Sequence, residues 1–305
     1  MTDKDFSEIL NLWQKDFYVN LDFEIQGSPE RSLERYAIED KQRERFILEK
    51  IPPKNLERKQ EIADNLKLLV GHGFDFANTY LSGNNGKSLQ KYENDFWQLS
   101  TYISGEELDR SNYWQEADRG RKLAQSLLEL YRVSEKLDLA DTTNFSLIEY
   151  LEKLVEQIKQ NNPKVYFEIL PVFEMLQQQL FPAYPQLPKV FCHGDPHPIN
   201  IIWKNGSVGK MIDWEFSGYK PYLYDIALII GCVGAEAKDA LSAGFLESFR
   251  NEIFVSKFIA QEDLVYLDDF ILAIRFAWLS EWLRRNDKPM IDFEIFYLKL
   301  LTKKR

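Results

Sequence analysis

Apolar side chains recur every three or four residues at the start of the chain, which predicts an amphipathic helix over residues 3–18. Three short runs typical of β-strands follow, at Leu21–Ile25, Glu34–Glu39 and Arg45–Ile51. Two consecutive prolines end the third run, because proline cannot donate to the hydrogen-bond ladder of a sheet. A second helical pattern then covers residues 56–70. This part of the chain therefore predicts strands with a helix before and after them.

The pattern changes after the fifth strand. Up to that point, two more strands are expected on either side of the turn Ser82–Gly86, the second of them over Phe96–Ile103. Later in the chain we expect helices over residues 118–136, 145–160, 165–180 and 222–302, with a β-hairpin over 189–213. This order predicts an α+β fold, with a small antiparallel sheet and one helix over residues 1–103 and a larger, mainly helical part over residues 104–305.

Composition narrows the class of protein. The 305 residues include 48 acidic side chains against 38 Lys and Arg, so the formal net charge is -10 and the isoelectric point is near 5.1. Such a charge argues against binding of duplex nucleic acid or of an anionic membrane, and it mildly favours a cationic small-molecule ligand. Cys192 and Cys232 are too few for a disulfide framework and lack the C-x-x-C spacing of zinc or redox sites.

No feature of the sequence predicts a membrane partner. The first residues lack the basic and apolar regions of a secretory signal. The longest apolar stretch, Ile226–Ala235, is much shorter than the roughly 20 residues that a membrane helix needs. We therefore expect a cytoplasmic protein.

The segment with the clearest chemical pattern reads H-G-D-P-H-P-I-N over residues 193–200 and continues to I-D-W-E over residues 212–215. Asp and Asn are common in turns for local hydrogen-bonding reasons, so turn capping is the simplest interpretation of Asp195 and Asn200. That interpretation does not explain why a second acid, Asp213, follows at hairpin spacing. A functional site explains both observations.

The hairpin predicts where these side chains meet. Asn205-Gly206 is typical of a two-residue turn of type I′, because both residues tolerate positive φ. A two-residue loop places Asn200 opposite Met211 and puts Asp213 on the same face of the ribbon. Such diagonal neighbours lie roughly 7–8 Å apart between Cα atoms. An amide oxygen and a carboxylate at that spacing reach one divalent cation.

Asp195 precedes the same hairpin, in a loop rich in Gly and Pro. Two carboxylates and an amide offer only oxygen ligands, which favours Mg²⁺ over zinc. In phosphoryl transfer, such a metal neutralises the phosphates while a carboxylate orients the attacking hydroxyl. The residues therefore suit phosphoryl transfer, with Asp195 beside a metal site made by Asn200 and Asp213.

The two motifs together resemble those of the aminoglycoside phosphotransferase and choline kinase family, which has a protein-kinase-like two-lobed fold. The likeness continues at Asp225 in Y-L-Y-D-I-A, because the family commonly carries D-x-A shortly after its metal-binding Asp. The order of elements matches over nearly the whole chain, whereas the specific motifs lie within residues 190–230. The resemblance implies a kinase that uses Mg²⁺ and either ATP or GTP.

The family implies a role for each matched residue. Asp195 corresponds to the catalytic base or to the residue that orients the acceptor hydroxyl, and Asn200 and Asp213 to the residues that hold Mg²⁺ against the nucleotide phosphates. Taken alone, histidines in such a loop are more simply explained as ordinary hydrogen-bonded residues. The expected supporting residues of the catalytic loop are His193, His197 and Asp225.

The N-terminal lobe is expected to supply the nucleotide contacts. In this fold the third strand presents a lysine to the phosphates, and Lys50 is the candidate, on one face with Phe46 and Leu48. The alternative is an exposed lysine at the strand end. The following helix is expected to pair a glutamate with this lysine, and Glu61 is favoured because an apolar helix face lies behind it. The alternatives to Glu61 are Glu57 and Asp64.

The turn Gln26–Pro29 stands where protein kinases carry a glycine-rich loop, so Gly27 and Ser28 are candidate phosphate contacts. Its single glycine departs from the G-x-G-x-x-G pattern. The fifth strand resembles the kinase hinge, and the backbone near Ser100 and Tyr102 is expected to bond the nucleotide base. Nothing in this strand separates ATP from GTP.

These features predict a kinase that transfers the γ-phosphate of ATP or GTP to a hydroxyl of a small, amine-bearing acceptor resembling an aminoglycoside, choline, ethanolamine or homoserine. The alternative is a catalytically silent kinase-like protein that binds nucleotide. A protein kinase is disfavoured because H-R-D, D-F-G and A-P-E are absent. The acceptor is expected between the hairpin and the acidic, aromatic C-terminal helices, although most of these aromatics have the spacing of core residues.

Overall fold

The structure, a computed structural model, describes residues 3–13, 17–19 and 31–303. The predicted strand Leu21–Ile25 and the candidate residues Gly27 and Ser28 lie outside the described residues. The helices are α1 (Asp3–Asn11), α2 (Leu56–Gly71), α3 (Ala117–Ser134), α4 (Leu147–Asn161), α5 (Pro163–Ala183), α6 (Tyr224–Val233), α7 (Gly244–Ser256), α8 (Leu267–Arg285) and α9 (Lys288–Lys303). The strands are β1 (Phe17–Val19), β2 (Glu34–Asp40), β3 (Arg45–Ile51), β4 (Gln90–Tyr92), β5 (Asp95–Thr101), β6 (Lys189–Cys192), β7 (Ile201–Lys204), β8 (Ser207–Met211) and β9 (Gly218–Pro221).

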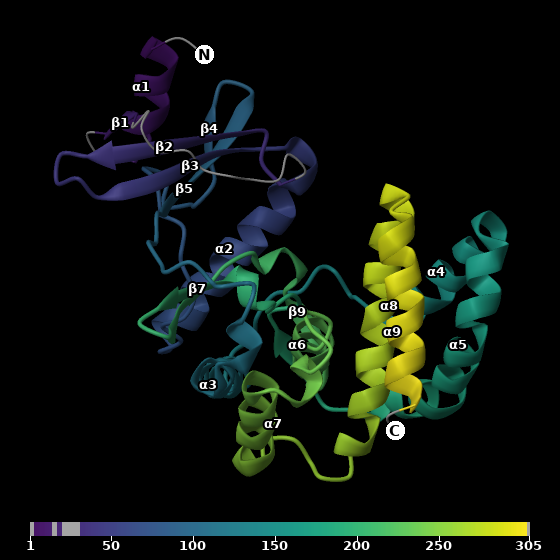
Figure 1. Cartoon of the computed structure of the whole chain (residues 1–305). Coiled ribbons are helices and arrows are strands. Elements are labelled where there is room, and N and C mark those ends of the chain that lie inside the picture. The colour runs from purple at the N-terminus through teal and green to yellow at the C-terminus, as the bar shows by residue number, and fades with distance from the viewer. Residues whose placement is uncertain (1–2, 14–16, 20–30, 304–305) are drawn as a thin grey trace.

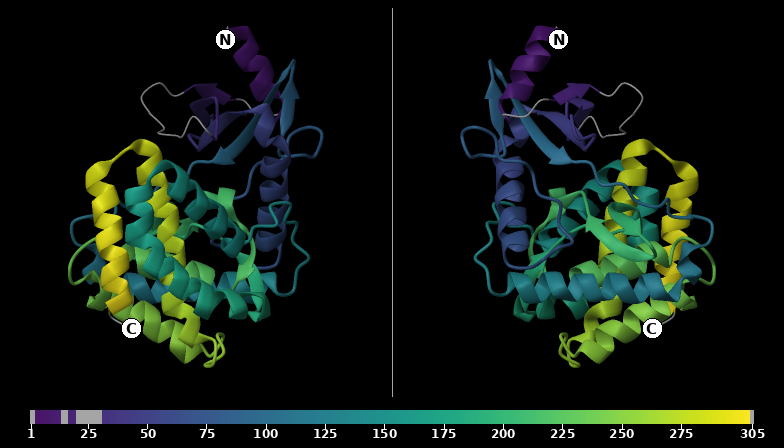
Figure 2. Two further views of the ribbon diagram at one scale, coloured as in Figure 1. Left: turned by 90° about the vertical axis from the view of Figure 1, so that its right-hand side faces the viewer. Right: turned by 90° about the vertical axis from the view of Figure 1, so that its left-hand side faces the viewer.

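The chain forms two lobes, as Figure 1 shows. The smaller lobe is an antiparallel sheet in the order β1-β2-β3-β5-β4, with α1 above it. The larger lobe is mainly helical. α2 extends from beside the sheet to this helical lobe (Figures 1 and 2). The predicted α+β architecture with two lobes is confirmed.

The sheet has a small core of its own on the side that α1 covers. Because side chains alternate along a strand, Ile47 and Glu49 of β3 point to the opposite side, toward the helical lobe. One face of β3 therefore packs in the core of the sheet, and the other lines the space between the lobes. The core residues are Ile9, Leu10, Trp13, Ile38, Phe46, Leu48, Trp97 and Leu99.

The helical lobe is built around buried helices. α6 is buried along its whole length, and α8 packs against both α6 and α9. α3 packs against α7 on another side of the lobe. No helix in the described part of the chain is long and apolar enough to cross a membrane.

β7 and β8 form the predicted hairpin with its two-residue loop. The predicted pairing of Asn200 with Met211 is wrong by one residue, because a β-bulge in the ladder shifts the register and pairs Met211 with Ile201. The main-chain oxygen of Asn200 instead accepts a hydrogen bond from the amide of Ile212 at 2.9 Å. Asn200 therefore still lies beside the strand end that leads into Asp213.

Two other predicted elements are wrong. The first helix ends at Asn11 rather than at residue 18, and Phe17 instead pairs with Asp40 in the sheet, where ladder formation overrides the helical pattern. The turn Ser82–Gly86 does not separate two strands. β4 and β5 both follow it and pair with each other.

Candidate active site

A cavity of about 740 Å³ lies between the sheet and the β7–β8 hairpin. One wall comes from β2 and β3, and the facing wall contains Asn200, Ile202 and Asp213. Ser100, in β5, and Tyr102, just beyond it, line a third side. The structure thus brings the residues predicted to bond the nucleotide base and the two predicted metal ligands to one cleft.

Asp195 is held in place by Asn200. The side-chain amide of Asn200 donates to the main-chain oxygen and to Oδ2 of Asp195, both at 2.9 Å. This leaves the side-chain oxygen of Asn200 for another ligand. Burial raises the pKa of Asp195 to about 6, against the opposing effects of the Asn200 hydrogen bond and the charge of Arg31. A carboxylate with that pKa is largely ionised at neutral pH and can orient a hydroxyl or accept its proton.

Asp213 has one carboxylate oxygen that the protein leaves unsatisfied. The residue adopts a left-handed backbone, with φ 70° and ψ 57°, before the 3₁₀ turn Trp214–Phe216. Its Oδ2 pairs with Arg31, whereas Oδ1 is buried and has no hydrogen-bond partner among the described residues. A buried carboxylate oxygen without a partner is unfavourable, and a bound cation would satisfy it.

Mg²⁺ fits this set of ligands. The Asp213 carboxylate and the remaining side-chain oxygen of Asn200 are hard oxygen donors from the two ends of one hairpin. Within the described ranges, no three or more His, Cys, Asp or Glu side chains form a metal-binding group. Phosphate oxygens and water would therefore complete the coordination, as is usual for Mg²⁺ at nucleotide sites.

The loop before Asp195 is fixed from behind. The carboxylate of Asp225 accepts hydrogen bonds from the main-chain amides of His193, at 2.8 Å, and Gly194, at 2.9 Å. The His193 ring is fully buried; its Nε2 donates to the main-chain oxygen of Ile212 at 3.0 Å, and its Nδ1 accepts from the amide of Asp195 at 3.3 Å. Burial lowers the pKa of His193 to about 3, so the ring is neutral. His193 and Asp225 thus lie behind Asp195 and do not line the cleft.

His197 begins the 3₁₀ turn Pro198–Asn200, where its Nδ1 accepts a hydrogen bond from the amide of Ile199 at 3.2 Å. Its Nε2 lies 4.0 Å from Oε1 of Glu236. Burial lowers the pKa of His197 to about 4, so the ring is uncharged at neutral pH. His197 therefore shapes the turn that carries Asn200.

The raised pKa of Asp195 predicts a pH dependence. Asp195 must be ionised to act on the acceptor hydroxyl, so kcat/KM for the nucleotide should rise with pH and level off above about 6. Initial rates over about two pH units on either side of this value would show the transition. A rate that stays flat through this range would contradict the assignment of Asp195.

Gly194 predicts a large effect on stability. Its φ is +87°, and a Cβ atom there would lie 1.9 Å from the main-chain oxygen of Phe216. We expect Gly194→Ala to lower the free energy of unfolding by at least about 2 kcal/mol, because the strained backbone adds to a clash with main-chain atoms. Urea unfolding measures this loss.

Gly206→Ala is the matched control. Gly206 also has positive φ, +67°, but a Cβ atom would meet nothing within 4 Å. It should therefore cost only the backbone penalty of about 1 kcal/mol. Equal losses in the two variants would show that the close approach of Phe216 is unimportant.

The prediction for Lys50 is wrong. Lys50 lies on the face of β3 away from the cleft, where its Nζ contacts Oε1 of Glu34 at 3.2 Å and Oδ2 of Asp95 at 2.8 Å. Lys50 does share a face with Phe46 and Leu48, but that is the face that α1 covers. A lysine on this face cannot reach a ligand in the cleft.

Glu61 does not pair with Lys50. It is buried on α2, where it pairs with Arg58 and accepts a hydrogen bond from the amide of Thr142 at 2.9 Å. The two alternatives, Glu57 and Asp64, are exposed. None of these three acids of α2 lines the cleft.

The cleft contains charged residues that sequence reasoning missed. Glu49 and Arg35 face it from β3 and β2, and Lys59 faces it from α2. Counting alternate residues from Glu49 rather than from Lys50 would have found the cleft face of β3. The signal was ambiguous because Lys50 matched the residue type that the resemblance implies.

The acids of the C-terminal helices do not form an open wall. Glu294 is fully buried in an ion pair with Arg275. Two further acids are paired as well, Glu281 with Arg284 and Arg285, and Asp292 with Lys288. The expectation that aromatics here belong to the core is confirmed for Phe270, which is fully buried.

Comparison with known proteins places the chain in a family. The sequence profile described as "Phosphotransferase enzyme family" matches residues 26–257. No curated protein matches the chain. The structure is similar to that of amicoumacin kinase hAmiN in complex with AMP-PNP, Ca²⁺ and Ami, with a TM-score of 0.67 and 14% identity over 100% of this chain and 94% of that one.

Two further solved structures have the same fold. A choline/ethanolamine kinase family protein from Mesorhizobium loti gives a TM-score of 0.64 and 16% identity, over 98% of this chain and 93% of the other. The GDP complex of wild-type aminoglycoside 2'-phosphotransferase-IIIa gives 0.62 and 16%, over 99% of each chain. At these identities the likeness shows the shared fold alone.

Proposed function

The chain belongs to the phosphotransferase enzyme family, and on that premise we propose that it transfers the γ-phosphoryl group of ATP or GTP to a hydroxyl of a small molecule, with Mg²⁺ as cofactor. One observation carries the proposal. Asp213, whose Oδ1 has no hydrogen-bond partner among the described residues, lines the same cleft as Asn200, and Asn200 in turn positions Asp195. The nucleotides named with the solved neighbours, AMP-PNP and GDP, support either donor.

The chemistry divides among three residues. Asn200 and Asp213 would hold Mg²⁺, which neutralises the charge of the phosphates when bound. Asp195 orients the acceptor hydroxyl and accepts its proton as the new bond to phosphorus forms and the bond to the nucleoside diphosphate breaks. The burial that raises the pKa of Asp195 makes this carboxylate a better proton acceptor than an exposed one.

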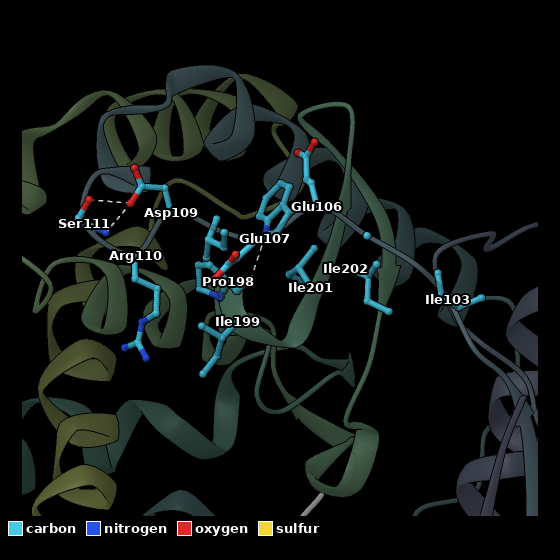
Figure 3. A pocket seen from close by; sticks show the side chains of 13 residues that line it. Ile103, Glu106, Glu107, Asp109, Arg110, Ser111, Pro198, Ile199, Ile201 and Ile202 are labelled. Atoms are coloured by element: carbon cyan, nitrogen blue, oxygen red, sulfur yellow. Dashed lines mark hydrogen bonds between the residues drawn. The ribbon is translucent and has the colours of Figure 1, made fainter. Parts of the chain in front are cut away.

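The acceptor is proposed to bind in a second cavity, of about 920 Å³, which Figure 3 shows. It adjoins the cleft, because Ile103, Ile199 and Ile202 line both cavities. Acidic side chains outnumber basic ones in its lining, which favours an amine-bearing acceptor. Part of the negative charge of the chain therefore lies at this cavity. This cavity lies beside residues 103–111, the linker that follows β5, rather than beside α8 and α9. Its charged lining residues are Glu106, Glu107, Asp109 and Arg110.

One observation favours the alternative of a silent nucleotide-binding protein. The cleft face of β3 presents Glu49, where a kinase is expected to present a lysine. A silent protein would bind Mg²⁺ and nucleotide without turnover. The retention of Asp195 together with both metal ligands favours the active enzyme.

A coupled assay for nucleoside diphosphate release tests the proposal over a panel of amino alcohols, amino sugars and aminoglycosides. We expect release that depends on both Mg²⁺ and one class of acceptor. Binding of Mg²⁺-nucleotide is followed in parallel by thermal unfolding, because a ligand of the native state raises its apparent stability. Binding without turnover across the panel would support the silent alternative.

A further inference from the structure

The N-terminal lobe presents charges to the cleft in the reverse of the expected arrangement. β3 contributes an acid, Glu49, and α2 contributes a base, Lys59. Glu49 is buried, and Nε of Arg35 donates to its Oε1 at 2.7 Å. Glu49 is therefore compensated by its own neighbour in the sheet, and β3 supplies no cation for a phosphate.

Lys59 is a buried cation in the same cavity as the metal ligands. It is 3% exposed and lines the cleft with Asn200 and Asp213. Its ammonium group pairs with Glu215, two residues beyond Asp213. A buried lysine charge is unfavourable without a compensating anion, and Glu215 is that anion when no nucleotide is present.

The backbone of Lys59 is fixed relative to the metal-binding turn. The neighbouring Arg58 donates to the main-chain oxygens of Glu215, at 3.0 Å, and Ser217, at 2.5 Å. From the sheet, Nε2 of Gln98 donates to the main-chain oxygen of Lys59 at 3.4 Å. Only the side chain of Lys59 would have to move for its ammonium group to leave Glu215 and reach a phosphate.

The other cations of the cleft already face acids, Arg31 with Asp213 and Arg35 with Glu49. We propose that Lys59, supplied by α2, is the lysine that contacts the nucleotide phosphates, and that Glu215 holds its ammonium group until the nucleotide binds. This inference rests on the proposed function. In this arrangement the lysine that contacts the phosphates comes from α2, and β3 presents the acid Glu49 to the cleft instead.

The wild-type protein provides the first test. ATP and GTP derivatives with a reactive acyl group on the terminal phosphate acylate lysines that contact the phosphates, and peptide mass spectrometry locates the modification. We expect acylation of Lys59 that excess Mg²⁺-nucleotide suppresses. Acylation of Lys50 or another lysine, with Lys59 unmodified, would overturn the inference and leave the proposed function standing. Failure of both nucleotides to bind would overturn both.

Substitution of Lys59 provides the second test. Lys59→Met keeps the length of the side chain and removes its charge, so kcat/KM for the nucleotide should fall by at least about a hundredfold. Lys67→Met, an exposed position on the same helix, is the matched control and should change this value less than about twofold. If Lys59 served only to tie α2 to the turn, the variant would lose thermal stability while the nucleotide KM stayed unchanged, and that result would contradict the inference. If Lys59→Met does not fold, the acylation of the wild-type protein decides.

Discussion

Replacing Asp195 with Asn should lower turnover by about a hundredfold to ten-thousandfold, the range expected for the loss of a general base. The substitution keeps the shape of the side chain but removes the group that orients the acceptor hydroxyl and accepts its proton. Asp195 does not line the nucleotide cleft, so affinity for Mg²⁺-nucleotide should remain close to that of the wild type. Initial rates in the coupled assay measure the loss.

Controls separate this chemical effect from damage to the loop. His193 accepts a hydrogen bond from the main-chain amide of Asp195, and Asn200 donates one to its main-chain oxygen, so the variant should keep its unfolding midpoint. Turnover within about threefold of the wild type would show that Asp195 is not the base. A matching loss of nucleotide binding would point to a disrupted loop instead.

Asp213→Asn should have a comparably large effect through the metal. The variant removes the negative charge whose Oδ1 lacks a partner, so turnover should fall by at least about a hundredfold and the Mg²⁺ concentration for half-maximal rate should rise. Rates measured across a Mg²⁺ series, with nucleotide held in excess, separate these two effects.

Asp118→Asn is the matched control for Asp213→Asn. Asp118 is exposed on α3 and pairs with Arg121. Its replacement by Asn therefore removes the same charge at a position away from the cleft. It should leave the Mg²⁺ dependence unchanged. An Asp213→Asn variant with wild-type Mg²⁺ dependence would rule out Asp213 as a metal ligand.

The helical-lobe part of the site could be predicted because it is local in sequence. Asn200 directly precedes β7 and Asp213 follows β8, so both lie at the open end of one hairpin. The two-residue loop leaves little freedom in the relative position of these two residues. Even the one-residue error in register had small consequences, since Asn200 bonds to Ile212 directly before Asp213. Asp225 follows closely enough that α6 brings it back to the same loop.

The N-terminal lobe could not be predicted in the same way, because its site depends on which face of β3 is covered. Alternation along the strand correctly groups Lys50 with Phe46 and Leu48, but it does not say whether that face meets the cleft or α1. Only the tertiary position of α1 decides the matter. The same ambiguity concealed Glu49, whereas Lys59 lies on α2, where only an acid was expected.

The structure shows where some of the acids behind the net charge of -10 are located. Three acids of the C-terminal helices, Glu281, Asp292 and Glu294, are paired with cations of the same helices. The acids of the linker cavity, among them Glu107, are instead placed next to the cleft. The charge therefore points to the linker, rather than to α8 and α9, as the place where an amine would bind.

The most direct test of the central claim follows the phosphorus atom itself. With wild-type protein, Mg²⁺, nucleotide and the acceptor that the panel identifies, ³¹P NMR should show the γ-phosphate signal replaced by that of a phosphate ester on the acceptor. The Asp195→Asn variant should show almost none of this ester in the same time. If the phosphorus appears only as inorganic phosphate, or stays on the nucleotide in the presence of every acceptor, the protein is not the small-molecule kinase proposed here.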